Sequence, residues 1–263
     1  MIFLSQSLSK EVKYLNQKYI FSMVSKNQIK LITSLHQKKF RQANNLFIAE
    51  GVKVINELLN SNFELEHLYE TENLFASISI NKRTLISSQD LKKISALTVP
   101  NNCLAIFKIP LPLSIQENGL ILALDDVRDP GNLGTILRLC DWFGIEQLVC
   151  SEQTVDLYNP KVVQATMGSI ARVNVTYLDL EKFLKQTKLP VFGTFMNGEN
   201  IYKTNLVQEA VIVMGNEANG ISVEIEKTIK NRLTIPRFGK LQQTESLNVA
   251  TATAIVLSEF RRS

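Results

Sequence analysis

The last strand and helix of the chain constrain its fold more than any other stretch. Residues 233–235, Leu-Thr-Ile, predict a short strand, which Pro236 ends because proline has no amide hydrogen to give to a sheet. A polar loop follows, and Ser246 is positioned to cap a helix by accepting from the free amides of its first turn. Alanine and threonine dominate the body of this helix, residues 249–260, so we expect it to pack closely on several sides.

Apolar strands alternate with helices through the second half of the chain, which predicts an α/β fold with a parallel sheet. The first of these strands, residues 120–124, is apolar throughout, as expected for a strand covered on both faces. Loops rich in Gly, Asn and Asp follow three strands, at residues 125–132, 196–200 and 215–220, and a fourth strand ends at Pro236. Because ligands bind beyond the carboxyl ends of parallel strands, these loops predict one shared pocket.

A smaller α/β region comes first in the chain. It begins with a basic helix at residues 25–45 and ends with a strand at residues 103–107, and prolines with an Asn-Gly pair follow it. The pattern predicts four segments: an N-terminal extension at 1–24, a small α/β domain at 25–109, a linker at 110–119 and a larger domain at 120–263. Met23 is an alternative start of the chain.

The positive charge of the chain is concentrated at its beginning. The net charge is +4, but the first 45 residues hold eight basic residues against Glu11 alone, so they carry +7 and the remainder carries −3. Such an excess is typical of a segment that meets nucleic-acid phosphates. A solvated lysine-rich arm is the alternative interpretation.

Several classes of protein are excluded by what the sequence lacks. Three cysteines (Cys103, Cys140 and Cys150) and two histidines are too few for a disulfide framework or a zinc site, and they fit a reducing, cytoplasmic compartment. No apolar run reaches membrane length, and the one at the start is too short for a signal peptide. We therefore expect no metal and no membrane partner.

Two common catalytic sites are also absent. The Gly131-Asn132-Leu133-Gly134 sequence breaks the glycine pattern of a dinucleotide site, and neither histidine lies in the predicted C-terminal sheet to complete a nucleophilic triad. Arg138 is the most informative single residue, because it lies among apolar neighbours on a predicted helix, where a buried charge needs a partner. It either pairs with Asp141 or Glu217 or binds an anion.

Three motifs in the second half resemble a known family. The sequences DPGNLGTILRLCDWFG, VIVMGNEANGIS and TIPRFGKLQQTESLNVATATAIVL resemble motifs 1, 2 and 3 of the SpoU/TrmH-type RNA 2′-O-ribose methyltransferases of the SPOUT superfamily. The basic N-terminal segment and the sequence FIAEG at residues 47–51 resemble the family's L30-like substrate-binding domain. One departure is the loop at residues 236–245, which is longer than in many members.

The resemblance implies a C-terminal trefoil knot, a homodimer whose active site uses residues of both subunits, and S-adenosylmethionine as cofactor. The implied cofactor-binding residues are Thr194, Gly215, Ile235 and Leu247. The implied catalytic residues are Asn132, Arg138, Glu217, Ser246 and Asn248. In this interpretation Arg138 binds the phosphate beside the target ribose, Asn132 and Asn248 orient the ribose and the loop, and Glu217 holds Arg138 or the knot.

The implied reaction is methyl transfer to a ribose 2′-hydroxyl in structured RNA. Ribosomal RNA is favoured because minimal tRNA-modifying members often lack the N-terminal domain. A tRNA 2′-O-methyltransferase remains an alternative, and so does a catalytically silent RNA-binding paralogue. The complete set of five polar positions argues against the silent paralogue, which has no need to keep them.

Overall fold

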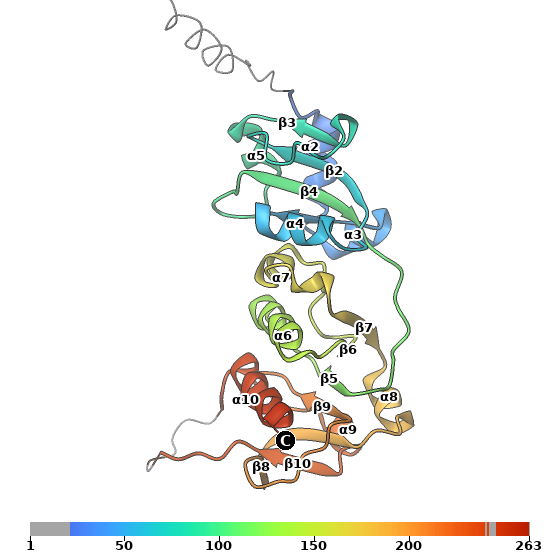
Figure 1. Cartoon of the computed structure of the whole chain (residues 1–263), viewed down its shortest axis with the longest axis vertical. Coiled ribbons are helices and arrows are strands. Elements are labelled where there is room, and N and C mark those ends of the chain that lie inside the picture. Colours follow the sequence, from blue (N-terminus) through green and yellow to red (C-terminus); the bar gives the residue numbers. More distant parts are fainter. Residues whose placement is uncertain (1–21, 240, 242–245, 263) are drawn as a thin grey trace, which may run out of the picture.

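Two sheets with their helices are stacked along the long axis of the molecule (Figure 1). The computed structural model describes residues 22–239, 241 and 246–262. Most of the expected N-terminal extension and part of the long loop at 236–245 therefore lie outside the described residues. The division into four segments stays a prediction, although the two sheets separate at the stretch between residues 108 and 120.

The first sheet has four strands in the order β1-β4-β2-β3. They are β1 (Leu46–Glu50), β2 (Leu65–Glu70), β3 (Arg83–Leu85) and β4 (Cys103–Lys108). Strand β4 runs antiparallel to both β1 and β2. Helices α2 (Lys26–Ser34) and α5 (Ser88–Ile94) pack on one face, and α4 (Val52–Leu59) packs on the other. A single turn, η2 (Ile80–Lys82), precedes β3.

The expected basic helix at residues 25–45 is two helices, α2 and α3 (Lys38–Asn44). The hydroxyl groups of Thr33 and Ser34 donate to backbone carbonyls within the last turns of α2, which competes with continued helix. The chain then turns, and Leu35 enters the core. The prediction of one continuous helix was wrong because only the tertiary fold makes this turn favourable.

The second sheet has six strands, and the pairs between them are all parallel, as the sequence predicts. Its order is β10-β8-β9-β5-β6-β7. The strands are β5 (Leu120–Leu124), β6 (Gln147–Ser151), β7 (Asn174–Leu178), β8 (Val191–Asn200), β9 (Ala210–Met214) and β10 (Asn231–Thr234). All residues of β5 and β9 are buried, so this sheet is covered on both faces.

Different helices cover the two faces of the second sheet. Helices α6 (Pro130–Phe143), α7 (Pro160–Ala165) and α10 (Val249–Arg262) share the main apolar core with alternate residues of β5. Helices α8 (Leu180–Gln186) and α9 (Val223–Glu226) pack on the opposite face. The short η3 (Ser169–Ala171) follows α7. None of the helices in the described part of the chain is long and apolar enough to span a membrane.

The sequence predicted a loop at residues 196–200, but this segment is part of β8. Strand β10 pairs with β8 in two places: Arg232 lies opposite Gly193, and the next residue, Leu233, lies opposite Glu199. Residues 194–198 therefore form a wide bulge between the two paired regions. The pairing that makes residues 199–200 a strand comes from a distant segment, so local sequence could not reveal it.

The two domains share one apolar core, and they meet through α7 and β1. The rings of Phe47 and Tyr158 lie 4.7 Å apart across this junction. Arg41 is only 2% exposed, and it forms an ion pair with Asp156 and donates to the carbonyl of Leu35. Arg41, one of the eight basic residues counted in the first 45, therefore has a structural role at the junction.

Candidate active site

The loops after β5 and β9 are hydrogen-bonded to each other at the carboxyl edge of the second sheet. The side chain of Asp125 accepts from the amide of Ser222 at 2.7 Å, and Asn216 donates to the carbonyl of Asp126 at 2.7 Å. Asp126 has a left-handed φ of +57°, which turns the chain sharply away from β5. These contacts join the two loops to each other, as a shared pocket requires.

Helix α6 starts at Pro130, three residues before Leu133, where the sequence predicts its start. The side chain of Asp129 accepts from the amide of Asn132 at 2.8 Å and caps the helix, and proline is favoured at the first helical position. This start places Asn132 in the first turn of α6, with its side chain directed toward the loop after β9.

Three of the predicted catalytic residues form a chain of side-chain hydrogen bonds. Asn132 donates to Glu217 at 2.8 Å, and Asn248 donates to Asn132 at 2.9 Å. They come from α6, from the loop after β9 and from the start of α10, so the fold brings together residues from all three motifs. We call Asn132, Glu217 and Asn248 the polar relay.

The cap of α10 is Asn248, whose side-chain oxygen accepts from the amides of Ala250 and Thr251 at 3.0 and 3.2 Å. The prediction that Ser246 caps this helix was wrong, because the helix begins at Val249, two residues later than a cap at Ser246 requires. Ser246 is exposed two residues before Asn248, and no interaction of its side chain is seen in the described part of the chain.

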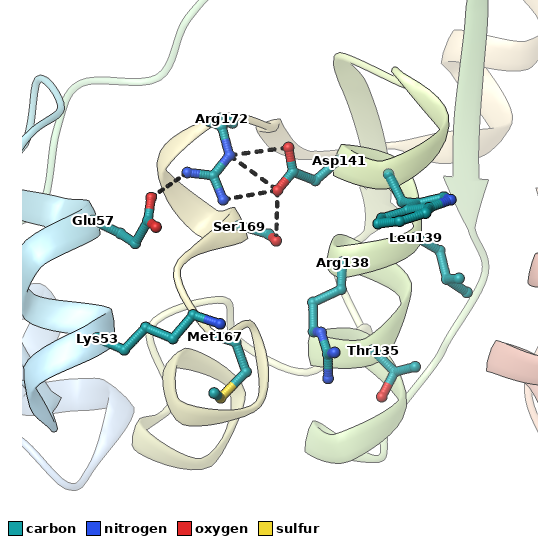
Figure 2. Close-up of a pocket in the computed structure, with 10 residues that line it drawn as sticks. Lys53, Glu57, Thr135, Arg138, Leu139, Asp141, Met167, Ser169 and Arg172 are labelled. Atoms are coloured by element: carbon teal, nitrogen blue, oxygen red, sulfur yellow. Dashed lines mark hydrogen bonds and ion pairs between the residues drawn. The ribbon is translucent and has the colours of Figure 1, made fainter.

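Arg138 lies apart from the polar relay. It is exposed, and no partner for it appears among the described residues. Neither expected ion pair exists, since Glu217 accepts from Asn132 and Asp141 accepts from Ser169 and Arg172. Arg138 is six residues beyond Asn132, so the two side chains leave α6 about 120° apart. Figure 2 shows Arg138 directed into a cleft between α4 and α6.

The predicted cofactor residues come from four segments near the same edge. The hydroxyl of Thr194, in the bulge of β8, donates to the carbonyl of Val213 at 3.4 Å, one residue before the end of β9. Gly215 follows β9 directly, Ile235 packs half-buried against the main core after β10, and Leu247 is exposed next to the cap of α10. No contact among the described residues joins Leu247 to the other three.

The comparisons with known proteins cover both domains. Residues 119–258 match the model of the SpoU rRNA Methylase family, and residues 26–105 match the MRM3-like substrate binding domain. A Bacillus subtilis protein named 23S rRNA (guanosine(2553)-2′-O)-methyltransferase RlmP is 30% identical over 246 residues, which are 90% of this chain and 97% of that protein.

Two solved structures resemble the whole fold. A putative RNA methyltransferase of the TrmH family from Porphyromonas gingivalis is 40% identical with a TM-score of 0.83, and covers 92% of this chain and 99% of its own. An AdoMet-bound rRNA methyltransferase from Sinorhizobium meliloti is 29% identical with a TM-score of 0.81, over 92% of this chain and 97% of its own.

Fold and motifs together define an S-adenosylmethionine-dependent RNA 2′-O-ribose methyltransferase. The chain belongs to the SpoU rRNA methylase family. The resemblance seen in the three sequence motifs is thereby confirmed, together with the α/β fold and the N-terminal substrate-binding domain.

The strand ends fit an adenosyl group. A Cβ atom added to Gly215 would lie 2.3 Å from the backbone of Gly220, so no side chain can cover the end of β9. Backbone groups at this end suit an adenine held by main-chain hydrogen bonds. Ile235, directly after β10, and Leu247, just before α10, have apolar side chains that suit contact with the adenine ring. Among the described residues, no group of three His, Cys, Asp or Glu side chains could hold a metal ion.

Sequence reasoning missed Asp125 and Asn216, which fix the two loops, and it missed Lys53, Trp142 and Arg172 in the cleft. Asp125 and Asn216 lie inside Gly/Asn/Asp-rich loops, so their composition was a usable signal. Lys53 and Arg172 had no such signal, because they come from different domains. The three cysteines are buried, and burial raises the pKa of the Cys103 thiol to about 12, which makes it a poor nucleophile.

Proposed function

We propose that this chain methylates the 2′-hydroxyl of a ribose in ribosomal RNA and that the polar relay and Arg138 are the residues that align the substrate. The polar relay carries the proposal, because its three members come from three separate motifs and bond to one another. The printed name of the Bacillus subtilis relative, a 23S rRNA 2′-O-methyltransferase, supports ribosomal RNA as the substrate class.

The reaction needs alignment more than acid catalysis. When bound, S-adenosylmethionine supplies a methyl group on a positively charged sulfur that leaves as a neutral thioether. The chain must therefore hold the ribose hydroxyl in line and keep the site rigid. Asn132 and Asn248 orient the ribose and its loop, Glu217 fixes the amide of Asn132, and exposed Ser246 contacts the target nucleotide.

Arg138 binds the phosphate next to the target ribose. A guanidinium has a planar set of donors that matches phosphate oxygens, and it keeps its proton at physiological pH, so it is a poor general base. The absence of any partner for Arg138 among the described residues supports this role, because its donors are available to an anion.

We infer that the enzyme is a homodimer in which Arg138 serves the site of the other subunit. Two observations support this arrangement. Arg138 and Asn132 leave α6 in different directions, and Trp142, one turn beyond Arg138, is 84% exposed. A large aromatic side chain with that exposure on a helix is typical of a surface that another protein covers.

Two further features belong to the same proposal. The family resemblance implies a trefoil knot at the C-terminus, and the packing of α10 against α6 is compatible with it. Cytoplasmic localisation is supported by three cysteines that are buried and unpaired.

The test is methyl transfer from labelled S-adenosylmethionine to an in vitro transcript of large-subunit ribosomal RNA, followed by mapping of the 2′-O-methyl nucleotide. We expect one methylated position in the transcript and no transfer to a pool of unmodified tRNA. Transfer to tRNA alone would establish the tRNA alternative. Binding of RNA without transfer to either substrate would establish the silent paralogue.

A further inference from the structure

A cleft lies between the two domains, outside the polar relay. Its volume is about 600 Å³, and it lies between α4 of the first domain, α6 of the second, and the segment at residues 167–172 (Figure 2). Figure 2 shows Lys53 on α4 and Arg138 on α6 directed into the space between the two helices. The cleft is open to solvent, and polar and charged side chains line it together with the apolar Leu139, Trp142 and Met167.

The acidic side chains in this cleft have hydrogen-bond partners, and two of its basic side chains have none among the described residues. Both acids, Glu57 and Asp141, accept hydrogen bonds from Arg172, with nitrogen-to-oxygen distances of 2.8 to 3.0 Å to Asp141. Lys53 and Arg138 have no bonded partner within the described ranges. The two walls therefore present one free cation each, and the acids that could neutralise them are already occupied.

The shape of the cleft is built into the junction. Gly168 has a φ of +101°, and a Cβ atom added there would lie 2.4 Å from Cγ of Glu57. The absence of a side chain at this position lets α4 approach the segment after α7. Arg172 then joins Glu57 of one domain to Asp141 of the other, and this brace fixes the spacing of the two walls.

We propose that this cleft binds the sugar–phosphate backbone of the substrate RNA, with Lys53 and Arg138 contacting phosphates from opposite walls. The proposal rests on the proposed function and extends it to a second contact from the substrate-binding domain. Phosphate oxygens are the ligands that free lysine and arginine side chains bind in nucleic-acid interfaces. A cleft formed by both domains couples the RNA held by the first domain to the active site that Arg138 serves.

Lys53→Ala tests the proposal through RNA affinity, which does not depend on methyl transfer. We expect the dissociation constant for a large-subunit ribosomal RNA transcript to rise roughly three- to tenfold. The slope of log affinity against log salt concentration should fall by about 1, the value for one lost phosphate contact. S-adenosylmethionine affinity and turnover at saturating RNA should stay as in the wild type, while KM for RNA rises.

Lys92→Ala is the matched control. Lys92 is an exposed lysine on α5, on the opposite face of the first sheet, so the same charge is removed far from the cleft. We expect no change in the salt slope for this variant. Equal salt slopes for Lys53→Ala and Lys92→Ala would overturn the proposal. A changed oligomeric state of Lys53→Ala with unchanged RNA affinity would also overturn it, because the cleft would then be a contact between subunits.

The two proposals fail in different ways. If the wild type binds the transcript but transfers no methyl group, the proposed function fails and the Lys53 slope still reports on the cleft. If transfer is normal and Lys53→Ala leaves affinity, KM and salt slope unchanged, only the cleft proposal is lost. A charge-reversed variant, Lys53→Glu, should weaken RNA binding further than Lys53→Ala if a phosphate is the ligand.

Discussion

Asn248 donates a hydrogen bond from its side-chain amide to the side-chain oxygen of Asn132 at 2.9 Å, across 116 residues of sequence. The direction of this bond follows from the cap of α10. The oxygen of Asn248 accepts from two helix amides, so its nitrogen must face Asn132. Asn132 must then present its oxygen to Asn248 and its nitrogen to Glu217. One helix cap thereby sets the orientation of the whole polar relay.

We predict that Asn248→Asp and Asn248→Ala separate the cap from the relay. Aspartate remains a good helix cap but cannot donate to Asn132, so this variant should keep wild-type stability within about 0.5 kcal/mol while methyl transfer falls strongly. Alanine loses both roles and should lower the free energy of unfolding by roughly 1–2 kcal/mol as well. Denaturant unfolding and single-turnover methyl transfer measure the two effects. If the aspartate variant kept full activity, the relay would have no part in catalysis.

Much of the fold could be predicted where the pattern is local. The sequence predicts strands at residues 120–124 and 210–214 and helices at 52–59 and 180–186, and these are the bounds of β5, β9, α4 and α8. Each is an apolar or amphipathic run between turn-forming residues. The bulge of β8 could not be predicted, because its strand character at residues 199–200 depends on pairing with β10. Local patterns do not contain the partner of a parallel strand.

The site residues stay a prediction, and the sequence could not show which of them contact one another. Ser246 and Asn248 are both good cap residues, and the choice between them depends on the contact of Asn248 with Asn132. The burial of Arg41 depends on Asp156, 115 residues away, so the charge count of the first 45 residues could not reveal it. Arg138 was singled out because it lies among apolar neighbours on a predicted helix, but its separation from the relay required the geometry of α6.

We predict that mixed dimers restore activity if the site uses both subunits. Arg138→Ala and Asn132→Ala should each abolish methyl transfer. When the two variants are co-expressed and form dimers at random, about a quarter of wild-type activity should return, because each mixed dimer holds one site with both residues intact. Methyl transfer by the purified mixture measures this. No recovery in a mixture that is shown to contain mixed dimers would place Arg138 and Asn132 in the site of one chain.

Gly168→Ala should destabilise the protein by roughly 2–4 kcal/mol, because the new methyl group adds a clash with Glu57 to the cost of a left-handed backbone. Gly119→Ala is the control, since Gly119 also has a positive φ, +66°, but no atom lies within 4 Å of an added Cβ. That variant should lose only about 1–2 kcal/mol. Urea unfolding compares the two, and equal losses would show that the approach of α4 to this segment does not constrain the junction.

Glu50→Gln should change how stability depends on pH. Glu50 is 4% exposed at the end of β1, where its carboxylate accepts from the hydroxyl of Ser95 and the amide of Ala96. Burial outweighs these bonds and raises the pKa of Glu50 above its ordinary value of 4.5. A carboxyl group with a raised pKa in the folded state stabilises the protein below the ordinary pKa, and that contribution is lost as the pH rises through the folded-state pKa.

The glutamine variant cannot ionise, so it avoids the cost of a buried carboxylate at neutral pH. We expect it to be as stable as the wild type or up to about 1 kcal/mol more stable at pH 7. As the pH falls toward 4.5, the free energy of unfolding of the wild type should rise relative to that of the variant, because Glu50 takes up its proton. Asp141 and other carboxylates titrate in both proteins and cancel in the difference. Denaturant unfolding of both proteins at pH 7 and pH 5 measures this difference. If the difference in their free energies of unfolding did not depend on pH, Glu50 would have an ordinary pKa in the folded state.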